Sequence, residues 1–284
     1  MGSTTTLPAM KTSPKYIFFT DFDGTITTRD SNDFMTDNLG FGEELRKQGN
    51  KDVLDDTKTF RDSFQTMMDS IKTPYSKCIE TLIQNIKLDP GFKEFFEWAR
   101  ENNIPVVILS GGMEPIIRAL LVHLLGEKEA AEIQIVSNQV EVREGFKSLD
   151  DEGGWNIVYH DERYIHDPNK DIGHRANDFN SHFGHDKSLE IRPYAELPDD
   201  QRPTMFYAGD GVSDLSAAKE TDLLFAKKGH HLITYCVREK VPFTIFEDWT
   251  YILSTVKDVV AGKTTVKEVY AAGIKDFEQG GNKA

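Results

Sequence analysis

Two acidic residues separated by one position follow the first strongly apolar segment of the chain. Tyr16 to Phe19 are large and apolar or aromatic, and Asp21 and Asp23 come soon after them, before Gly24. Such a run is typical of a strand buried on both faces of a parallel sheet. Alternate residues of an extended strand share a face, so both carboxylates would aim at one point. Two close carboxylates repel each other, which favours a cation beside them, although an Asp-Gly turn after a strand explains the same pattern.

Two later apolar runs, at 105–109 and 205–208, also end in polar residues. Ser110 and Gly111 follow the first of these runs, and Asp210 and Asp214 follow the second. Lys187 precedes the second run. The carboxyl ends of parallel strands meet at one edge of a sheet, where ligands bind. We therefore expect these residues to gather near Asp21.

A set of carboxylates with one serine, one lysine and glycines suits phosphoryl transfer. Oxygen-only ligands favour Mg²⁺ over zinc or copper. A carboxylate can attack phosphorus, and a second acid can protonate the leaving alkoxide and then accept a proton from water. A hydroxyl, backbone N–H groups and an ammonium can hold the phosphate oxygens, where charge gathers.

Apolar runs of strand length alternate with helical patterns along most of the chain, which predicts an α/β fold with a parallel sheet and helices on both faces. Residues 30–87 differ, because their apolar residues recur at helical spacing, so we expect a helical insertion after the first strand. The predicted organisation is a flexible leader at 1–14, an α/β core at 15–29 and 88–274 with a long polar hairpin and loop at 143–186, a helical cap at 30–87 and a flexible tail at 275–284.

Composition narrows the class of protein. The 284 residues carry a net charge of -14, which argues against general binding to nucleic acid or anionic membranes. The two cysteines form no disulfide framework, no secretory signal is visible, and no apolar run approaches the length of a membrane span. We expect a cytoplasmic protein, and the sequence does not indicate its oligomeric state.

Five of the eight histidines lie in the polar stretch at 143–186, namely His160, His166, His174, His182 and His185. A second metal site would use such residues. Their irregular spacing and the lack of a nearby cysteine favour an ordinary solvated loop instead.

Taken together, these segments resemble the haloacid dehalogenase superfamily of Mg²⁺-dependent phosphatases. The matching motifs, in the family's order, are DFDGT at 21–25, LSGG at 109–112, Lys187 and GDGVSD at 209–214. The resemblance implies a Rossmann-like core and identifies the insertion at 30–87 with the family's helical cap. The chain is most similar to the phosphoserine-phosphatase-like branch. DSNDFMTDNLGFG after the first motif and GDGVSDLSAAKE are especially similar to small fungal phosphatases that act on polyol phosphates.

The resemblance implies roles for the four matching aspartates. Asp21 would be the nucleophile and a Mg²⁺ ligand. Asp23 would be the general acid and base, with its backbone carbonyl on the metal. Asp210 would be the third protein ligand, and Asp214 would either bind the metal or orient a water on it. Dehalogenases of the superfamily lack the acid at the position of Asp23, so its presence favours a phosphatase or a phosphomutase.

Three further positions would hold the phosphate by the same resemblance. Ser110, Gly111 and Lys187 match the family's phosphate-binding residues, and Lys187 would also offset the charge of Asp21. Thr25 lies next to the turn, where it would either orient Asp23 or cap the turn.

The cap is expected to read the rest of the substrate. Asp30 lies nine residues after Asp21, where phosphoserine-specific relatives carry a glutamate that reads the amino group, but it is also a good N-cap for the next helix. Arg46, Lys47 and Arg61 would either read a substrate carboxylate or be solvated surface charges. Because no strong carboxylate clamp is visible, a small polyol or sugar phosphate is favoured as substrate.

Three other functions remain open at this point. One is a phosphatase for phosphoserine-type or phosphocholine-type substrates. Another is a phosphomutase or phosphotransferase, which would need a cap that excludes water. A non-enzymatic phosphometabolite sensor is disfavoured, because all the catalytic acids are present.

Overall fold

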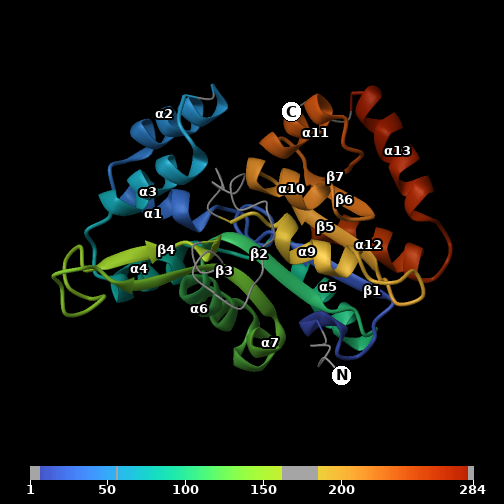
Figure 1. Ribbon diagram of the computed structural model, residues 1–284, viewed down its shortest axis with the longest axis horizontal. Helices are drawn as coiled ribbons and strands as arrows, with labels where there is room; N and C mark the ends of the chain where they lie inside the picture. The colour runs from blue at the N-terminus through green and yellow to red at the C-terminus, as the bar shows by residue number, and fades with distance from the viewer. Residues whose placement is uncertain (1–6, 56, 162–184, 281–284) are drawn as a thin grey trace. The chain divides into compact units, whose positions relative to one another are not determined.

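The computed structural model of the chain describes residues 7–55, 57–161 and 185–280 (Figure 1). The chain divides into two compact units. The first consists of Met1–Ile26, Leu88–Leu109 and Lys187–Ala284, and the second of Thr27–Lys87 and Ser110–Asp186. The predicted boundaries between a core and a cap remain a prediction.

The strands form a seven-stranded sheet of order β4-β3-β2-β1-β5-β6-β7. Strand β1 pairs in parallel with β2 and β5, β5 with β6, and β6 with β7, whereas β3 and β4 are antiparallel. The predicted α/β class with a mostly parallel sheet is therefore confirmed. The strands are β1 (Tyr16–Thr20), β2 (Val106–Met113), β3 (Gln134–Val142), β4 (Trp155–Val158), β5 (Thr204–Gly209), β6 (Leu223–Lys227) and β7 (Thr244–Phe246).

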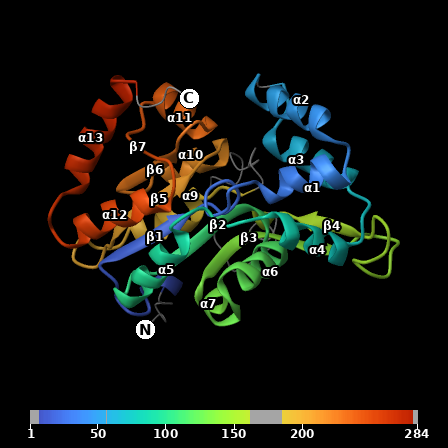
Figure 2. The same cartoon turned by 180° about the vertical axis from the view of Figure 1, so that it is seen from behind.

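In the first unit, apolar strands lie between two layers of helices. Phe18 of β1 lies opposite Val106 of β2 and Phe206 of β5, and these side chains are buried. Helices α9 and α10 lie in front of the strands in Figure 1, whereas α5 and α12 lie in front of them in Figure 2. The helices of this unit are α5 (Phe92–Glu101), α9 (Ser188–Ala195), α10 (Leu215–Ala218), α11 (His231–Glu239), α12 (Trp249–Val260) and α13 (Val266–Glu278).

The second unit joins the helical insertion to the hairpin of β3 and β4. Helix α6 packs on β3 and on α4, and α3 packs on β4. The stripe of Phe64, Met67 and Met68 is buried, as expected for ordinary helix packing. The helices of this unit are α1 (Ser31–Leu39), α2 (Glu43–Leu54), α3 (Phe60–Ser70), α4 (Tyr75–Asn85), α6 (Glu114–Leu125) and α7 (Glu127–Glu132).

Three segments differ from the sequence prediction. Strand β2 does not end at Ser110 but continues through the glycines to Met113, because glycine adopts extended backbone as readily as other residues. Residues Pro8–Met10 of the predicted leader form a 3-10 helix, and buried Ala9 donates its N–H to the Tyr194 hydroxyl at 3.3 Å. Helix α13 runs past the predicted start of the tail to Glu278.

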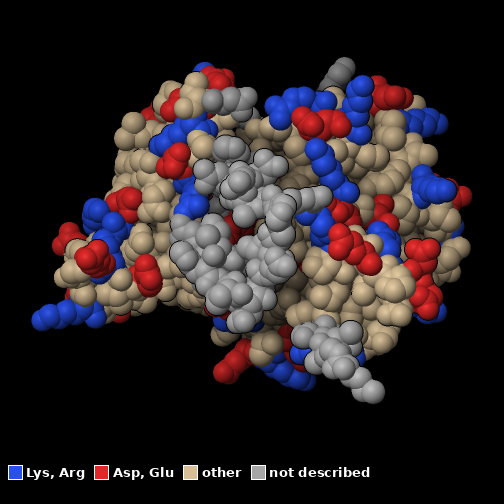
Figure 3. Space-filling view, viewed as in Figure 1, with Lys and Arg blue, Asp and Glu red and all other residues tan. Residues whose placement is uncertain are grey.

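The surface of the described residues carries charges of both signs. On the face in Figure 3, Lys and Arg side chains are interspersed with Asp and Glu. Among the described residues, no helix combines the length and apolar character that a membrane crossing requires.

Candidate active site

The first motif forms a tight turn at the end of β1. The backbone N–H of Asp21 donates to the Ala208 carbonyl at 2.9 Å. The hydrogen bonding between β1 and β5 therefore extends one residue past the end of β1. Asp21 and Asp23 are both buried, each with 6% of its surface exposed. Gly24 reverses the chain with a φ of 72°, a conformation that favours glycine.

The turn approaches the loop after β5 closely. A Cβ atom on Gly24 would lie 2.5 Å from Asp210 Oδ2, so only glycine allows this approach. The loop continues into a short 3-10 helix, Val212–Asp214, which places Asp214 back under the strand end. The structure thus brings the two predicted pairs of acids together, as the parallel sheet required.

Lys187 lies between the two acidic motifs. Its side chain is fully buried, and its Nζ donates to Asp21 Oδ1 at 2.7 Å and to Asp214 Oδ1 at 2.6 Å. Lys187 is the residue that precedes α9, so the start of this helix fixes the position of the side chain. An ammonium group without water must be held by such partners, because an unpaired buried charge is strongly unfavourable.

Burial and charge act in opposite directions on this cluster. Burial raises the pKa of Asp21 well above its usual value; Lys187 lowers it, and the charges of Asp214 and Asp210 raise it further. For Lys187, burial lowers the pKa, but Asp21 and Asp214 outweigh that effect and the pKa is raised. The lysine therefore stays charged, while one cation does not fully offset three neighbouring carboxylates.

These residues fit a divalent metal. Asp21, Asp210 and Asp214 each offer an oxygen, and these oxygens all lie within 4.8 Å of one another. Carboxylate oxygens are the ligands that Mg²⁺ prefers. The raised pKa of Asp21, which has burial as its main cause, indicates that an additional positive charge would stabilise the ionised site.

The carboxylate of Asp214 is already fully hydrogen-bonded. Its Oδ1 accepts from Lys187 Nζ at 2.6 Å and from the Tyr207 hydroxyl at 2.5 Å. Its Oδ2 accepts from the backbone N–H groups of Asp210 and Gly211 at 3.0 and 2.9 Å. A carboxylate has about four acceptor positions, so Asp214 acts here as an anchor for its neighbours.

The predicted phosphate-binding residues Ser110 and Gly111 belong to the second unit. Ser110 is buried, its Oγ accepts from the Gly112 N–H at 2.9 Å, and its carbonyl lies 3.0 Å from His185 Nδ1. The Gly111 carbonyl accepts from Asn138 Nδ2 at 2.7 Å. Their role toward phosphate remains a prediction.

The hydroxyl of Thr25 neither orients Asp23 nor caps the turn, the two roles expected from the sequence. The Thr25 hydroxyl is buried and has no hydrogen-bond partner within the described part of the chain. The Thr25 carbonyl instead accepts from the indole Nε1 of Trp249 at 2.8 Å. One of the contacts of this turn therefore comes from α12, far along the sequence.

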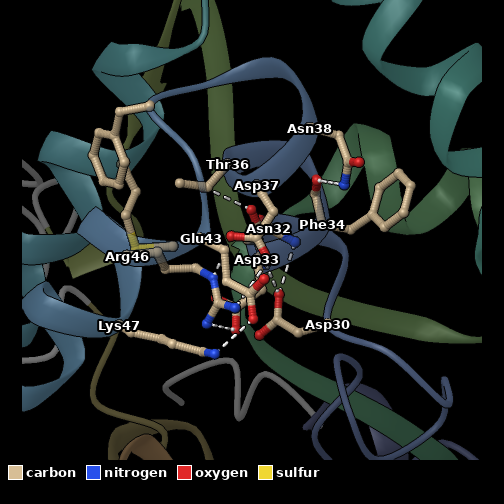
Figure 4. Close-up of polar contacts among 12 residues, drawn as sticks. Asp30, Asn32, Asp33, Phe34, Thr36, Asp37, Asn38, Glu43, Arg46 and Lys47 are labelled. Carbon is tan, nitrogen blue, oxygen red and sulfur yellow. Dashed lines mark hydrogen bonds and ion pairs between the residues drawn. The ribbon is translucent and has the colours of Figure 1, made fainter.

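Asp30 and Arg46, which could either read substrate or have a structural role, both make contacts within the protein (Figure 4). Asp30 caps α1, because its Oδ1 accepts from the N–H groups of Asn32 and Asp33 at 2.7 and 2.9 Å. The guanidinium of Arg46 pairs with Asp33 at 2.7 Å and, through two nitrogens, with Asp37 at 2.7 and 2.9 Å. Arg46 is thus a structural ion-pair partner and not the solvated charge of one expectation.

Lys47 and Arg61, the other two basic residues considered as readers of a substrate carboxylate, also have partners within the protein. Lys47 pairs with Glu43 at 2.7 Å on the exposed surface of α2. The Arg61 guanidinium lies over the Tyr159 ring, 4.4 Å from its centre.

The histidine-rich stretch is described only at its ends. The rings of His160 and His185 lie with their centres 4.7 Å apart. His166, His174 and His182 lie outside the described residues.

Sequence reasoning missed three residues of this site. Tyr207 lies within an apolar run and reads as an ordinary strand residue; the signal that could have found it is that a buried tyrosine normally needs a partner for its hydroxyl. His230, whose Nδ1 lies 3.0 Å from Asp210 Oδ2, follows that acid at no diagnostic spacing. Trp249 gave no sequence signal, because its contact to the turn spans more than two hundred positions.

The chain matches the family described as haloacid dehalogenase-like hydrolase over residues 18–219. It belongs to this family. The match covers the first motif and the acidic loop after β5, which the geometry above brings together.

Relatives and solved structures agree with this assignment. The chain is 48% identical over 261 residues to the polyol phosphate phosphatase PYP1 of Saccharomyces cerevisiae, covering 90% of this chain and 98% of that protein. It is 52% identical over 234 residues to the Pdp3-interacting factor 1 of Schizosaccharomyces pombe, covering 82% and 91%. A solved structure of phosphoserine phosphatase, an analogue of the phospho-aspartyl intermediate, shares the fold with a TM-score of 0.58 and 19% identity. The match covers 85% of this chain and 98% of that chain. The prediction of a phosphatase of this superfamily is confirmed.

Proposed function

We propose that this chain is a Mg²⁺-dependent phosphomonoesterase that releases phosphate from a small polyol phosphate through an aspartyl-phosphate on Asp21. The observation that carries the proposal is the buried Lys187, shared at 2.7 and 2.6 Å between Asp21 and Asp214 beside Asp210. A buried cation among three carboxylates suits a site that must accept a phosphate dianion.

The reaction divides between Asp21 and Asp23. A carboxylate oxygen of Asp21 forms a bond to phosphorus while the bond from phosphorus to the substrate oxygen breaks, and Asp23 gives that alkoxide a proton. A water molecule then attacks the phosphorus, Asp23 accepts its proton, and the bond to Asp21 breaks. Inorganic phosphate leaves, and both carboxyl groups return to their starting states.

The remaining residues bind and orient. Lys187 holds a phosphate oxygen and offsets the charge of Asp21, and Ser110 and Gly111 contribute a hydroxyl and a backbone N–H to the phosphate. The carboxylates of Asp21 and Asp210 and the carbonyl of Asp23 would hold Mg²⁺, which supplies a counter-charge for the phosphate oxygens.

Asp214 serves this site as an anchor. Its four hydrogen bonds support a role in positioning Lys187 and the backbone at Asp210. With its acceptor positions occupied, Asp214 is a poor candidate both for binding the metal and for orienting a water on it, the two roles that the resemblance implies.

The substrate class rests on the similarity to a polyol phosphate phosphatase and on the state of Arg46. Because two aspartates occupy its guanidinium, Arg46 is a poor reader of a substrate carboxylate. A neutral polyol chain therefore fits better than phosphoserine, with Asp30 as the candidate to accept hydrogen bonds from its hydroxyls. Phosphocholine-type substrates, phosphoryl transfer to another acceptor, the absence of nucleic-acid partners and a cytoplasmic location stay predictions.

The test is phosphate release from a panel of phosphomonoesters, with Mg²⁺ and with a chelator. The panel contains ribitol, sorbitol, arabitol and glycerol phosphates, phosphoserine, phosphocholine and a nucleotide. We expect Mg²⁺-dependent release, highest for a polyol phosphate and lost in Asp21→Asn. Asp258→Asn, which changes an exposed aspartate paired with Lys263, is the matched control and should behave as wild type.

Two results would count against parts of the proposal. Transfer of phosphate to an added polyol without release into water would favour a phosphotransferase. A preference for phosphoserine would retain the mechanism but overturn the proposed substrate class.

A further inference from the structure

Tyr207 is the one hydrogen-bond donor to the Asp214 carboxylate, among the described residues, that matches no motif of the family. It lies on β5 opposite Phe19 of β1, three residues before Asp210, and no part of its surface is exposed. Its hydroxyl donates to Asp214 Oδ1 at 2.5 Å. The same oxygen accepts from Lys187 Nζ at 2.6 Å, so the two donors share one acceptor atom.

We propose that Tyr207 is a positioning residue that sets how Lys187 is divided between Asp21 and Asp214. This inference rests on the proposed function, because it concerns the lysine that would hold the phosphate. The Tyr207 hydroxyl donates to Asp214 and, within the described part of the chain, makes no hydrogen bond to the proposed metal ligands Asp21 and Asp210. It therefore acts through Asp214.

The shared oxygen couples the two donors to each other. The ammonium of Lys187 has one short contact to Asp21 and one to Asp214, and the stronger acceptor draws it closer. A hydroxyl that donates to Asp214 Oδ1 partly neutralises this atom and so weakens its attraction for the ammonium of Lys187. With that donor present, Lys187 remains available to Asp21 and to a phosphate on it.

Removing the hydroxyl reverses this balance. Asp214 Oδ2 stays fixed by the N–H groups of Asp210 and Gly211, so the carboxylate cannot rotate to find another donor. Oδ1 is buried and must then rely on Lys187 alone, which draws the ammonium away from Asp21.

The tyrosine keeps its proton under working conditions. Burial raises its pKa well above the usual value, and the charges of Asp214 and Asp21 raise it further. The hydroxyl therefore remains a donor, and its contribution does not depend on pH over the range in which the enzyme would act.

The experiment compares Tyr207→Phe with Tyr270→Phe. Both changes remove one hydrogen-bonded hydroxyl and keep the ring. The Tyr270 hydroxyl accepts from the Leu224 N–H at 2.8 Å on β6, and the charged group that influences it is Asp222, so it is a control outside the cluster. For each protein we would measure kcat and KM on the best polyol phosphate, and the dissociation constant of inorganic phosphate by calorimetry with Mg²⁺ present.

In Tyr207→Phe we expect kcat to fall about tenfold and the dissociation constant of inorganic phosphate to rise about threefold, as for loss of a hydrogen bond to a charged group. Tyr270→Phe should change neither by more than about twofold. A lower melting temperature with unchanged kcat and phosphate affinity would overturn the inference, because it would assign Tyr207 to packing alone.

Two further points keep the test decisive. The dissociation constant is measured well below the melting temperature of each variant, where the folded state dominates, so that loss of stability does not alter it. Tyr207→Met replaces the phenylalanine variant if the latter does not accumulate, because methionine adapts to an irregular cavity. An inactive wild-type protein would refute the proposed function and this inference with it. An active wild type with an unaltered Tyr207→Phe would refute this inference alone.

Discussion

The ion pair of Lys227 and Asp89 supports the turn that carries Asp21 and Asp23. Lys227 ends β6, and its ammonium pairs with Asp89 Oδ2, both side chains being nearly buried. Asp89 Oδ1 accepts from the Trp249 N–H at 3.0 Å, and the Asp89 N–H donates to the Ile26 carbonyl at 2.8 Å. The segment that returns from the helical insertion is thereby tied to the end of the first motif.

We predict that Lys227→Met destabilises the protein by about 3 kcal/mol at pH 8, because it leaves a buried carboxylate without its cation. Methionine retains the packing of the stem beside the Phe246 ring, which lies 4.9 Å from Nζ, so the lost charge dominates. The unfolding entropy of a chain of 284 residues is about 0.6 kcal/mol per kelvin, so the melting temperature should fall by about 5 °C.

The loss should depend on pH. Burial raises the pKa of Asp89, and Lys227 lowers it, so removing the lysine raises this pKa further. A carboxyl whose pKa is higher in the folded state costs no stability below its unfolded pKa and an increasing amount as the pH rises toward its folded pKa. The decrease in melting temperature should therefore be smaller at pH 5 than at pH 8.

Differential scanning fluorimetry at both pH values tests this reasoning. Lys228→Met is the matched control, because the neighbouring Lys228 pairs with Glu247 on the exposed surface, where a pair contributes less than about 1 kcal/mol. Adding Asp89→Asn to Lys227→Met should restore more than half of the loss, since asparagine is neutral and still accepts from Trp249. An equal decrease at pH 5 and pH 8, or no decrease at all, would refute the reasoning.

Three other changes test the surroundings of the site. Trp249→Phe removes the donor to the Thr25 carbonyl and part of a buried side chain, so we expect a loss of about 2–4 kcal/mol in thermal unfolding and a lower kcat. Asp30→Asn keeps the cap of α1, whereas Asp30→Ala loses about 1 kcal/mol; an increased KM in the asparagine variant, with an unchanged melting temperature, would show that Asp30 also reads substrate. Arg46→Gln should lower the melting temperature by about 2–4 °C, while Lys47→Gln, in an exposed pair, should leave it unchanged within about 1 °C. Equal melting temperatures for the two cap variants would contradict the structural role of Arg46.

The strands and the order of the motifs could be predicted because their signals are local. Each buried strand is a short apolar run, and the acids of the first and last motifs follow such runs directly. Parallel pairing then requires that Asp21 and Asp210 meet at one edge of the sheet, whatever the details of packing. The same local chemistry gave the N-cap as one of the two roles expected for Asp30, and the structure shows that cap.

The partners of the longer polar side chains could not be predicted from such local signals. Arg46 could equally have faced solvent, and only the packing of α1 against α2 brings Asp33 and Asp37 to its guanidinium (Figure 4). The extension of β2 through Ser110 was also missed, because Ser-Gly-Gly is as compatible with a strand as with a turn.

The sequence by itself determined the α/β architecture and the family and indicated the acids that we propose do the chemistry, since residue type and spacing along single strands carry that information. The tertiary structure alone decided which donors surround those acids. Tyr207, Trp249 and the pair of Lys227 with Asp89 act on the site through contacts between residues distant in the chain. Such contacts depend on how several elements pack together, and no periodicity or motif within one element records them.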